Sequence, residues 1–382
     1  MDSTIEEMSF TLPEDHAALA ALAEEIFADQ ASTERVVEVE RAEGGFDRRL
    51  WKLLADSGLL AACLPESTGG GGMGVLGLVT IAEQQGRRVA PVPFWSVVAA
   101  AAWPIAEFGS VTLKERLLDR ILSGDALVVG AFDGVAGEVG VTGVRDADAV
   151  VVEGTAVGVP AAAEAEAVVV PVRLADGTTN VVVVATGASG VTVTPVAATG
   201  QGSAATVRFQ GVRVSNEDVL DGGDVDVAAW TLQRARLALC GVQLGTCAEA
   251  LTATAAYVSQ REQFGRPIST NQAVAVRAAD AHLDTEAIRL TTLRAAWLLD
   301  SGRDQEAESA VLVAKFWAAR GGLRVVHATQ HLHGGIGADI DYPIHRYFLW
   351  GRQAAFSLGG SDQLAAELGA VLESAPPIGA PA

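Results

Sequence analysis

The 382-residue sequence contains few cysteines. Its three cysteines, Cys63, Cys240 and Cys247, are too few for the disulfide framework of a small secreted scaffold. Cys240 and Cys247 would lie two turns apart on one helix, roughly 10 Å along its axis, which is too far for a disulfide. All three are therefore expected to be buried, unpaired thiols.

Positive charge is also scarce. The chain has 27 Lys and Arg residues against 47 Asp and Glu residues, for a formal net charge of −20. Lysine occurs only as Lys52, Lys114 and Lys315. A nucleic acid or an anionic membrane surface would require a basic face, so neither is expected as a partner.

Long apolar runs are absent, although 49% of the residues are hydrophobic. No run reaches about 18 uncharged apolar residues, the length that a membrane span needs. The most apolar stretch, Val89–Ile105, is interrupted by three prolines. The N-terminus carries acidic residues at positions 2, 6 and 7, whereas a secretory or transit peptide would be basic. We therefore expect no membrane span and a cytoplasmic location.

The sequence divides into three zones of different composition, with boundaries at about residues 124 and 221. Residues 1–124 and 222–374 carry apolar residues at helical spacing. Residues 375–382 form a Pro- and Ala-rich tail that is expected to be flexible. The predicted helices are 14–28, 46–57, 74–88, 111–123, 226–259, 270–301, 305–332, 343–357 and 361–373.

The middle zone, residues 125–221, alternates short β-rich runs with Gly and Asp turns. Six such runs are typical of a small β-barrel or sandwich. The expected fold class is α+β: an N-terminal helical domain, a middle β domain and a C-terminal antiparallel helical bundle. The predicted strands are 126–132, 149–152, 167–172, 180–185, 190–196 and 205–209.

Two motifs lie between the helices of the C-terminal zone. The first is Arg261-Glu-Gln-Phe-Gly-Arg-Pro-Ile-Ser-Thr-Asn-Gln272, and the second is Gln330-His-Leu-His-Gly-Gly-Ile-Gly337. An Arg at a helix end can bind a diphosphate, and bare glycine backbone lets a flat or phosphorylated ligand approach closely. Together they indicate a bound nucleotide cofactor.

In order and spacing these motifs resemble the flavin-binding signatures of the acyl-CoA dehydrogenases. The resemblance also includes Tyr342-Pro-Ile-His-Arg346 and covers nearly the whole chain. It implies α,β-dehydrogenation of an acyl-CoA thioester, an electron-transfer acceptor, and FAD between the β domain and the bundle. The adenosine end of the FAD would reach across a subunit interface.

By position in these motifs, the resemblance gives six residues a role in binding FAD. Arg261 would contact the diphosphate, with Phe264 and Gln272 packing and hydrogen-bonding nearby. Gln330, Gly334 and Gly335 would line the path of the adenosine. Taken singly, each has an ordinary alternative, such as a helix-end charge, a core Phe or a glycine C-cap.

The family's reaction needs a carboxylate base, because the α-proton of the thioester is a weak acid. The usual Glu follows the last long helix, and the matching residue here is Gly359. Some members place the Glu on the first bundle helix, where this chain has Ala235. Asp362 has a shorter side chain in a shifted position and is a weak substitute. No catalytic residue is therefore expected in this chain.

The β domain also departs from the family pattern. The Thr-Glu-Pro-x-x-Gly-Ser run is only loosely matched by residues 132–138, and the flavin-facing Trp-Ile-Thr-Asn strand corresponds to Gly158-Val-Pro-Ala161. Gly and Pro supply neither an aromatic face nor a hydroxyl. The chain would thus keep the half of a FAD site that it lends to a neighbour and lose much of its own half.

This asymmetry resembles certain bacterial enzymes in which two unlike subunits form an α2β2 assembly, several of them in sterol side-chain breakdown. The resemblance implies a base-bearing homologous subunit as partner, acting on a steroid or fatty acyl-CoA. Two alternatives stay open: a self-sufficient homo-oligomeric dehydrogenase with a non-standard base, and a non-catalytic binding protein on the same fold.

His327 and His331 have the i, i+4 spacing of zinc ligands on a helix. The residue after His327 is Ala328 rather than the Glu of a metalloprotease, and no carboxylate lies nearby in the sequence. We therefore predict no metal site. The Gly69–Gly72 run is not followed by Lys-Ser or Lys-Thr and is expected to be a connector.

Overall fold

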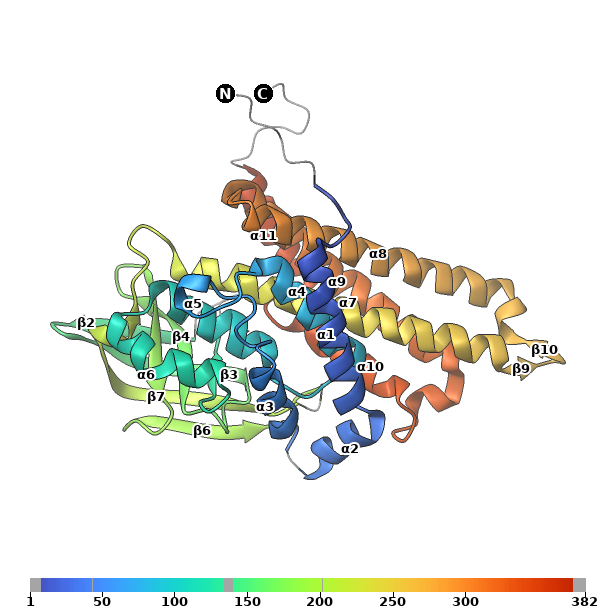
Figure 1. The fold of residues 1–382 in the computed structure, drawn as a ribbon, viewed down its shortest axis with the longest axis horizontal. Helices are drawn as coiled ribbons and strands as arrows, with labels where there is room; N and C mark the ends of the chain where they lie inside the picture. The colour runs from blue at the N-terminus through green and yellow to red at the C-terminus, as the bar shows by residue number, and fades with distance from the viewer. Residues whose placement is uncertain (1–7, 43, 134–139, 201, 374–382) are drawn as a thin grey trace, which may run out of the picture.

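The computed structural model describes residues 8–42, 44–133, 140–200 and 202–373. Within these ranges the chain forms N-terminal helices, a middle β-sheet and a C-terminal helical bundle, which confirms the predicted α+β fold (Figure 1). The expected tail, residues 375–382, lies outside the described residues, as do residues 134–138 of the loosely matched β-domain run.

The four helices expected in the N-terminal part are present, and the described residues contain two further helical segments that were not predicted, one of them surface-exposed and one buried. The first of these is α2, Thr33–Ala42, which buries only Val36 and Val39 and therefore carries a weak apolar pattern. The expected helices are α1 Glu14–Gln30, α3 Arg48–Asp56, α4 Gly74–Arg88 and α6 Val111–Leu122.

A buried helix that the sequence pattern did not predict crosses the apolar stretch 89–105. A π-helix, Trp95–Ala102, runs directly into α5, Trp103–Phe108, and all eight of its residues are buried. The prolines do not break it, because Pro91 and Pro93 precede it and Pro104 lies in the first turn of α5. A proline is tolerated in a first turn, where its missing N–H has no helical partner.

The β domain contains all six predicted strands, most with shifted ends, and two more. The expected strands are β1 Val128–Gly130, β3 Ala149–Pro160, β4 Ala167–Leu174, β5 Thr179–Ala185, β6 Val191–Val196 and β7 Ala204–Ser215. The additional strands are β2 Val141–Asp146 and β8 Val219–Leu220. The sheet has the order β6-β7-β3-β2-β4-β5-β8, and β1 pairs with β4 in parallel.

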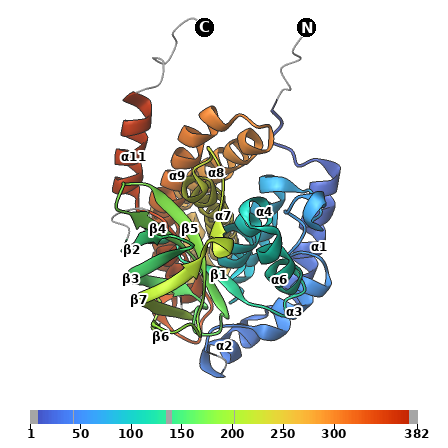
Figure 2. The ribbon, with the colours of Figure 1, turned by 90° about the vertical axis from the view of Figure 1, so that its left-hand side faces the viewer.

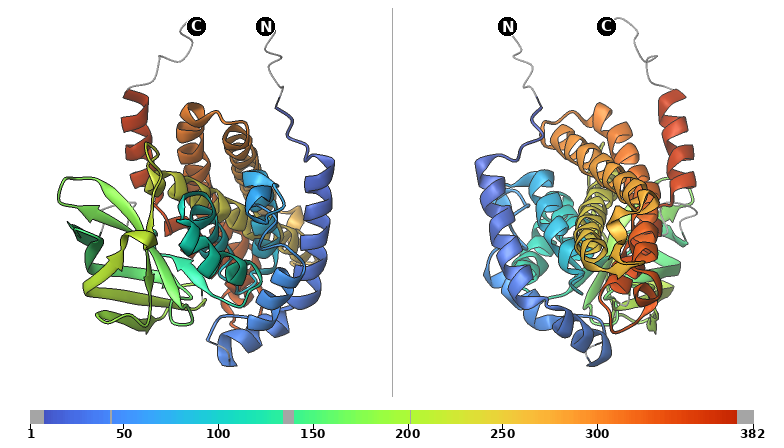
Figure 3. Two further views of the ribbon diagram at one scale, coloured as in Figure 1. Left: turned by 60° about the vertical axis from the view of Figure 1, so that its left-hand side comes forward. Right: turned by 90° about the vertical axis from the view of Figure 1, so that its right-hand side faces the viewer.

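The C-terminal part is the expected helical bundle. Its long helix α7, Val227–Gln260, lies between the β-sheet and the N-terminal helices (Figure 2). The other helices are α8 Gln272–Asp300, α9 Asp304–His333, α10 Ile344–Phe356 and α11 Ser361–Glu373. Of these, α8 and α9 pack side by side (Figure 3).

Glycines allow α4 and α7 to touch through their backbones. A Cβ on Gly86 would collide with the carbonyl of Val242, and one on Gly245 would collide with the carbonyl of Glu83. This close approach makes α7 a core helix. By length and composition alone α7 could cross a membrane, but 72% of its most apolar window is buried against the rest of the protein.

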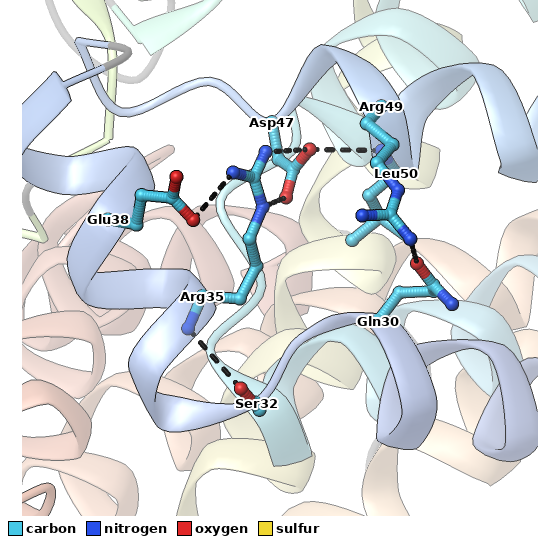
Figure 4. Close-up of polar contacts among 7 residues, drawn as sticks. All are labelled: Gln30, Ser32, Arg35, Glu38, Asp47, Arg49 and Leu50. Atoms are coloured by element: carbon cyan, nitrogen blue, oxygen red, sulfur yellow. Dashed lines mark hydrogen bonds and ion pairs between the residues drawn. The ribbon is translucent and has the colours of Figure 1, made fainter.

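A charged junction fixes the segment between α2 and α3 (Figure 4). Arg35 on α2 donates two hydrogen bonds to the carboxylate of Asp47, at 2.8 and 2.9 Å. The same carboxylate caps α3 by accepting from the N–H of Leu50 at 3.0 Å, and the N–H of Asp47 donates to the Pro91 carbonyl. Gly45 and Phe46, just before Asp47, are thereby held against the core of the molecule.

Candidate functional site

The first motif forms a β-hairpin at the far end of the bundle (Figure 1). α7 ends at Gln260, and the two-residue strands β9, Glu262–Gln263, and β10, Arg266–Pro267, pair antiparallel. Phe264 and Gly265 form the tip with φ of +55° and +75°. Positive φ at both central residues is typical of a type I′ turn. The Phe264 side chain is 98% exposed, so it packs against nothing in its own chain.

The second motif ends α9 in an open glycine turn. Gly334 has a φ of +67°, and a Cβ on Gly334 or Gly335 would meet nothing within 4 Å. The Gln330 amide donates to the Gly337 carbonyl at 3.0 Å, which closes the turn. Bare backbone is therefore accessible at Gly334 and Gly335, as a cofactor that approaches closely would require.

An aromatic stack brings the two motifs to the same end of the bundle. The ring of Tyr257, one turn before Arg261, stacks on the ring of His333 with centroids 4.5 Å apart. Tyr257 also donates to the His333 carbonyl at 3.4 Å. Arg261, Phe264 and Gln272 are all exposed here. We name this group, Arg261 to Gln272 with Gln330 to Gly337, the bundle-end site.

The bundle-end site fits part of a nucleotide cofactor. It offers an exposed guanidinium, an exposed aromatic ring and open glycine backbone, a set suited to a diphosphate and a flat ring. Gln330 is a less direct candidate than Gly334 and Gly335, because the Gly337 carbonyl already engages its amide. His331 is exposed at the same turn.

The position of the family's usual base is a rigid turn without a carboxylate. Three charged side chains meet on the backbone of the turn Ser357–Gly360, and we call them the turn clamp. Lys315 on α9 donates to the Ala354 and Gly359 carbonyls, both at 3.1 Å. Arg236 on α7 donates to the Leu358 carbonyl at 3.0 Å. Asp133 accepts from the Leu358 N–H at 2.5 Å.

The clamp was not predicted, because its members lie far apart in the sequence. Lys315 is fully buried, and a buried lysine needs partners to offset its lost hydration. Leu358 and Gly359 have φ of +57° and +112°, so the clamp holds them in conformations that L-residues rarely adopt. Arg236 also pairs with Glu367 on α11 at 2.8 Å. The turn is therefore a fixed part of the fold.

Alanine at position 359 is expected to destabilise the protein by about 1–3 kcal/mol, whereas alanine at 360 should cost less than about 0.5 kcal/mol. At 359 the φ of +112° is strained for any side chain, and the new Cβ would lie 3.3 Å from Leu364. At 360 the nearest atom lies 3.6 Å away. Urea unfolding of Gly359→Ala and Gly360→Ala measures the difference, and equal costs would contradict the strained turn.

The clamp should also give stability an alkaline pH dependence. Burial lowers the pKa of Lys315 from its ordinary 10.5 to about 8, with Cys240 and Asp133 opposing the shift and Arg236 adding to it. Between these pH values the unfolded chain binds more protons than the folded one, so this group makes the unfolding free energy rise with pH. The neutral amine keeps two N–H donors for its two carbonyl partners.

The measurement compares the wild type with Lys315→Met by urea unfolding across pH 7 to 11. The difference in unfolding free energy should be constant below the folded-state pKa of about 8 and grow up to about 10.5. Taking the difference cancels the titration of other groups such as Tyr347. A difference independent of pH would show that Lys315 does not titrate in this window.

The alternative base position is closed. Ala235 is fully buried on α7. Its neighbour Arg234 stacks on Trp230, with the guanidinium 3.5 Å from a ring centroid, and points toward Trp103. Asp362 is exposed in the first turn of α11. Neither of the two positions at which family members carry the base, here Ala235 and Gly359, has a carboxylate side chain.

A crevice of about 340 Å³ opens beside the turn clamp, between the β domain and α10. Its walls include Asp133, Gly158, Gln353 and Phe356. Gly158 and Pro160, at the irregular end of β3, provide no aromatic wall or hydroxyl. Burial raises the pKa of Asp133, while the Leu358 N–H and the Lys315 charge oppose that rise. This is the place where the chain's own half of a flavin site would lie.

The candidate zinc pair does not form a metal site. His327 packs edge-on against Phe348, with centroids 4.8 Å apart, and His331 is exposed to solvent. Among the described residues, no group of three His, Cys, Asp or Glu side chains could hold a metal ion. Cys63, Cys240 and Cys247 are buried and unpaired, as expected.

Comparisons with known proteins show the family to which the chain belongs. Residues 13–125 match the acyl-CoA dehydrogenase N-terminal domain, and residues 223–371 match its C-terminal domain. Acyl-CoA dehydrogenase FadE27 of Mycobacterium tuberculosis is 37% identical over 97% of this chain and 100% of its own length.

Two solved structures are also similar. One chain of the ChsE4-ChsE5 complex from Mycobacterium tuberculosis is 37% identical, with a TM-score of 0.90 over 97% of this chain and 100% of that one. A variant of the Tcur3481-Tcur3483 steroid ACAD is 40% identical, with a TM-score of 0.88 over 95% and 99%. The chain therefore belongs to the acyl-CoA dehydrogenase family of FAD-binding oxidoreductases, as its motifs predicted.

Proposed function

We propose that this chain is the base-lacking subunit of a heteromeric acyl-CoA dehydrogenase. In this proposal its bundle-end site completes the FAD site of a homologous subunit that carries the base. The observation that carries the proposal is the turn Ser357–Gly360, where three charged side chains hold backbone that has no carboxylate of its own.

Dehydrogenation needs a base for the α-proton of the thioester, and in this proposal the partner supplies it. FAD, when bound, accepts the β-hydrogen as a hydride. The role of the residues of this chain would be to bind and orient the FAD. Arg261 would pair with the diphosphate, Phe264 and Gln272 would pack and hydrogen-bond nearby, and Gln330, Gly334 and Gly335 would line the path of the adenosine.

The similar structures support a heteromeric assembly. One of them is a chain of a two-component complex, and the other is a variant of a steroid ACAD with a two-part name. By analogy, we propose that the partner of this chain is a homologous dehydrogenase subunit and that the two form an α2β2 assembly. We also propose that the substrate is a steroid or fatty acyl-CoA. An electron-transfer acceptor reoxidises the flavin.

One observation favours a second function, a self-sufficient homo-oligomeric dehydrogenase. Asp133 is a partly buried carboxylate that lines the crevice beside the turn, and desolvation raises its pKa. A carboxylate with a raised pKa is a candidate general base. In that case Asp133 would take the role that Gly359 cannot fill.

One experiment separates the two functions. The chain is co-expressed with a base-bearing homologue, and acyl-CoA-dependent bleaching of the flavin is followed. Replacing the homologue's base Glu by Gln should abolish bleaching, whereas Asp133→Asn in this chain should leave it within about twofold, because an amide oxygen still accepts from the Leu358 N–H. The reverse pattern would establish Asp133 as the base and refute the heteromeric proposal.

A further inference from the structure

The outer side of α8 is apolar and exposed. The helix lies along an outer edge of the bundle (Figure 1 and Figure 2). Of its 29 residues only nine are buried, and none of residues 272–280 is among them. Val276, Leu283 and Leu290 are 52%, 67% and 37% exposed. An exposed apolar face of this length on one helix is typical of a surface that binds another protein.

The spacing of the apolar residues on this side is symmetric. Steps of 3, 4, 4 and 3 residues separate them, so they lie within an arc of about 80° on one face of the helix. We call these five residues the α8 stripe: Val276, Ala279, Leu283, Ala287 and Leu290.

Because the steps of the α8 stripe read the same in both directions, the stripe is complementary to itself. A second α8, packed antiparallel about a two-fold axis at Leu283, would place Leu283 opposite its own copy. The same axis would place Val276 opposite Leu290 and Ala279 opposite Ala287. The small alanine pair would let the two helices approach closely, since the distance between helix axes depends on the side chains at the contact.

A groove on the same face supports this symmetric packing. It has a volume of about 650 Å³ and lies between α8 and α9, with Leu283 on one wall and Leu323 and His327 on the other. Leu283 therefore projects from the surface directly beside a hollow. A two-fold interface uses such a pair, because each copy presents the same projection and the same hollow to the other.

The charge of this face allows two copies of an acidic chain to meet. The whole chain has a net charge of −20, but residues 272–299 carry three arginines and three acidic residues. Residues 309–333 of α9 carry three cations and no acidic residue. Glu286, which flanks the stripe, already pairs with Arg289 at 2.7 Å. Repulsion between two copies is therefore weak through this face.

We propose that the α8 stripe binds a second copy of this chain, with the two α8 helices antiparallel about an axis at Leu283. This inference rests on the proposed function and deepens it, because an α2β2 assembly needs a contact between its two pairs of unlike subunits. The bundle-end site binds the homologue within a pair, and the α8 stripe joins the two pairs.

Charge at the axis tests the proposal. In the complex with the homologue, Leu283→Asp and Leu283→Lys should each split the α2β2 assembly into αβ pairs, weakening it at least about 100-fold, because two like charges then meet at the axis. An equal mixture of the two variant complexes should reassemble to within about tenfold of wild type, because Asp then faces Lys. Sedimentation equilibrium measures all three samples.

Val111→Asp is the matched control, since Val111 is 72% exposed on α6, and it should leave the assembly intact. Tetramers retained by Leu283→Asp and Leu283→Lys would overturn the inference. So would a mixture that stays as αβ pairs, which would mean that the stripe binds the homologue and not a second copy. Recovery on mixing also proves that both variants are folded.

Flavin retention keeps this test separate from that of the proposed function. Leu283→Asp and Leu283→Lys should retain FAD and acyl-CoA-dependent bleaching in the αβ pair within about twofold of wild type, because the stripe is not part of the bundle-end site. Failure of the wild-type chain to bind the homologue would refute the proposed function instead. The same variants of the chain alone should then still pass from dimer to monomer and recover on mixing.

Discussion

Phe264→Asn is expected to stabilise the isolated chain and to weaken its association with a homologous subunit about 30-fold, or about 2 kcal/mol. Phe264 has a φ of +55° and is 98% exposed, so its side chain adds nothing to its own fold. Asparagine adopts this conformation more easily, and Asn-Gly is the preferred pair in a two-residue hairpin turn. The isolated chain should therefore gain up to about 1 kcal/mol.

The opposite signs of the two effects make the prediction specific. An exposed aromatic ring at a hairpin tip is typical of an interface anchor, which is costly to remove only in the complex. Urea unfolding measures the first effect, and calorimetric titration with the homologue measures the second. Phe10→Ala, at another exposed phenylalanine, is the control and should leave association unchanged. Unchanged association in Phe264→Asn would exclude the hairpin from the interface.

Arg261→Ala is expected to reduce FAD retention by the co-purified complex about 10- to 100-fold, without changing the stability of this chain by more than about 0.5 kcal/mol. Arg261 is exposed just after α7, and its backbone, rather than its guanidinium, caps the helix. Its charge is therefore available to a diphosphate, and removing it should cost one charge-assisted contact.

Arg266→Ala is the matched control. Arg266 lies in the same hairpin and carries the same charge, but its guanidinium donates to Asn271 at 2.9 Å. FAD retention in this variant should stay within about threefold of wild type, because only general electrostatic attraction is lost. Flavin absorbance of the complex after gel filtration measures both variants. Equal losses would mean that the charge of the hairpin matters and the position of Arg261 does not.

The fold was largely predictable from the sequence, because long amphipathic helices and short β-rich runs have distinct periods. The errors fall where these signals are weak. α2 buries only two apolar residues, and the π-helix 95–102 is apolar on every side and flanked by prolines. The strands β2 and β8 are short or half exposed, so they lack a clear alternation of apolar and polar residues.

The two motifs of the bundle-end site could be found in the sequence because each of them is contiguous. Its geometry could not, since the stacking of Tyr257 on His333 depends on how α7 and α9 pack. The absence of a carboxylate at Gly359 was visible in the sequence, but the turn clamp was not. Lys315, Arg236 and Asp133 come from three separate segments, and only the packing of α7, α9 and the β domain brings them together.

The most direct test of the central claim is rapid mixing of this chain alone, in the presence of added FAD, with an acyl-CoA under anaerobic conditions. The flavin spectrum should stay oxidised, because no residue of the turn Ser357–Gly360 carries a carboxylate that can accept the α-proton. Adding the base-bearing homologue should restore bleaching. Rapid bleaching by the chain alone would contradict the account and identify a complete catalyst.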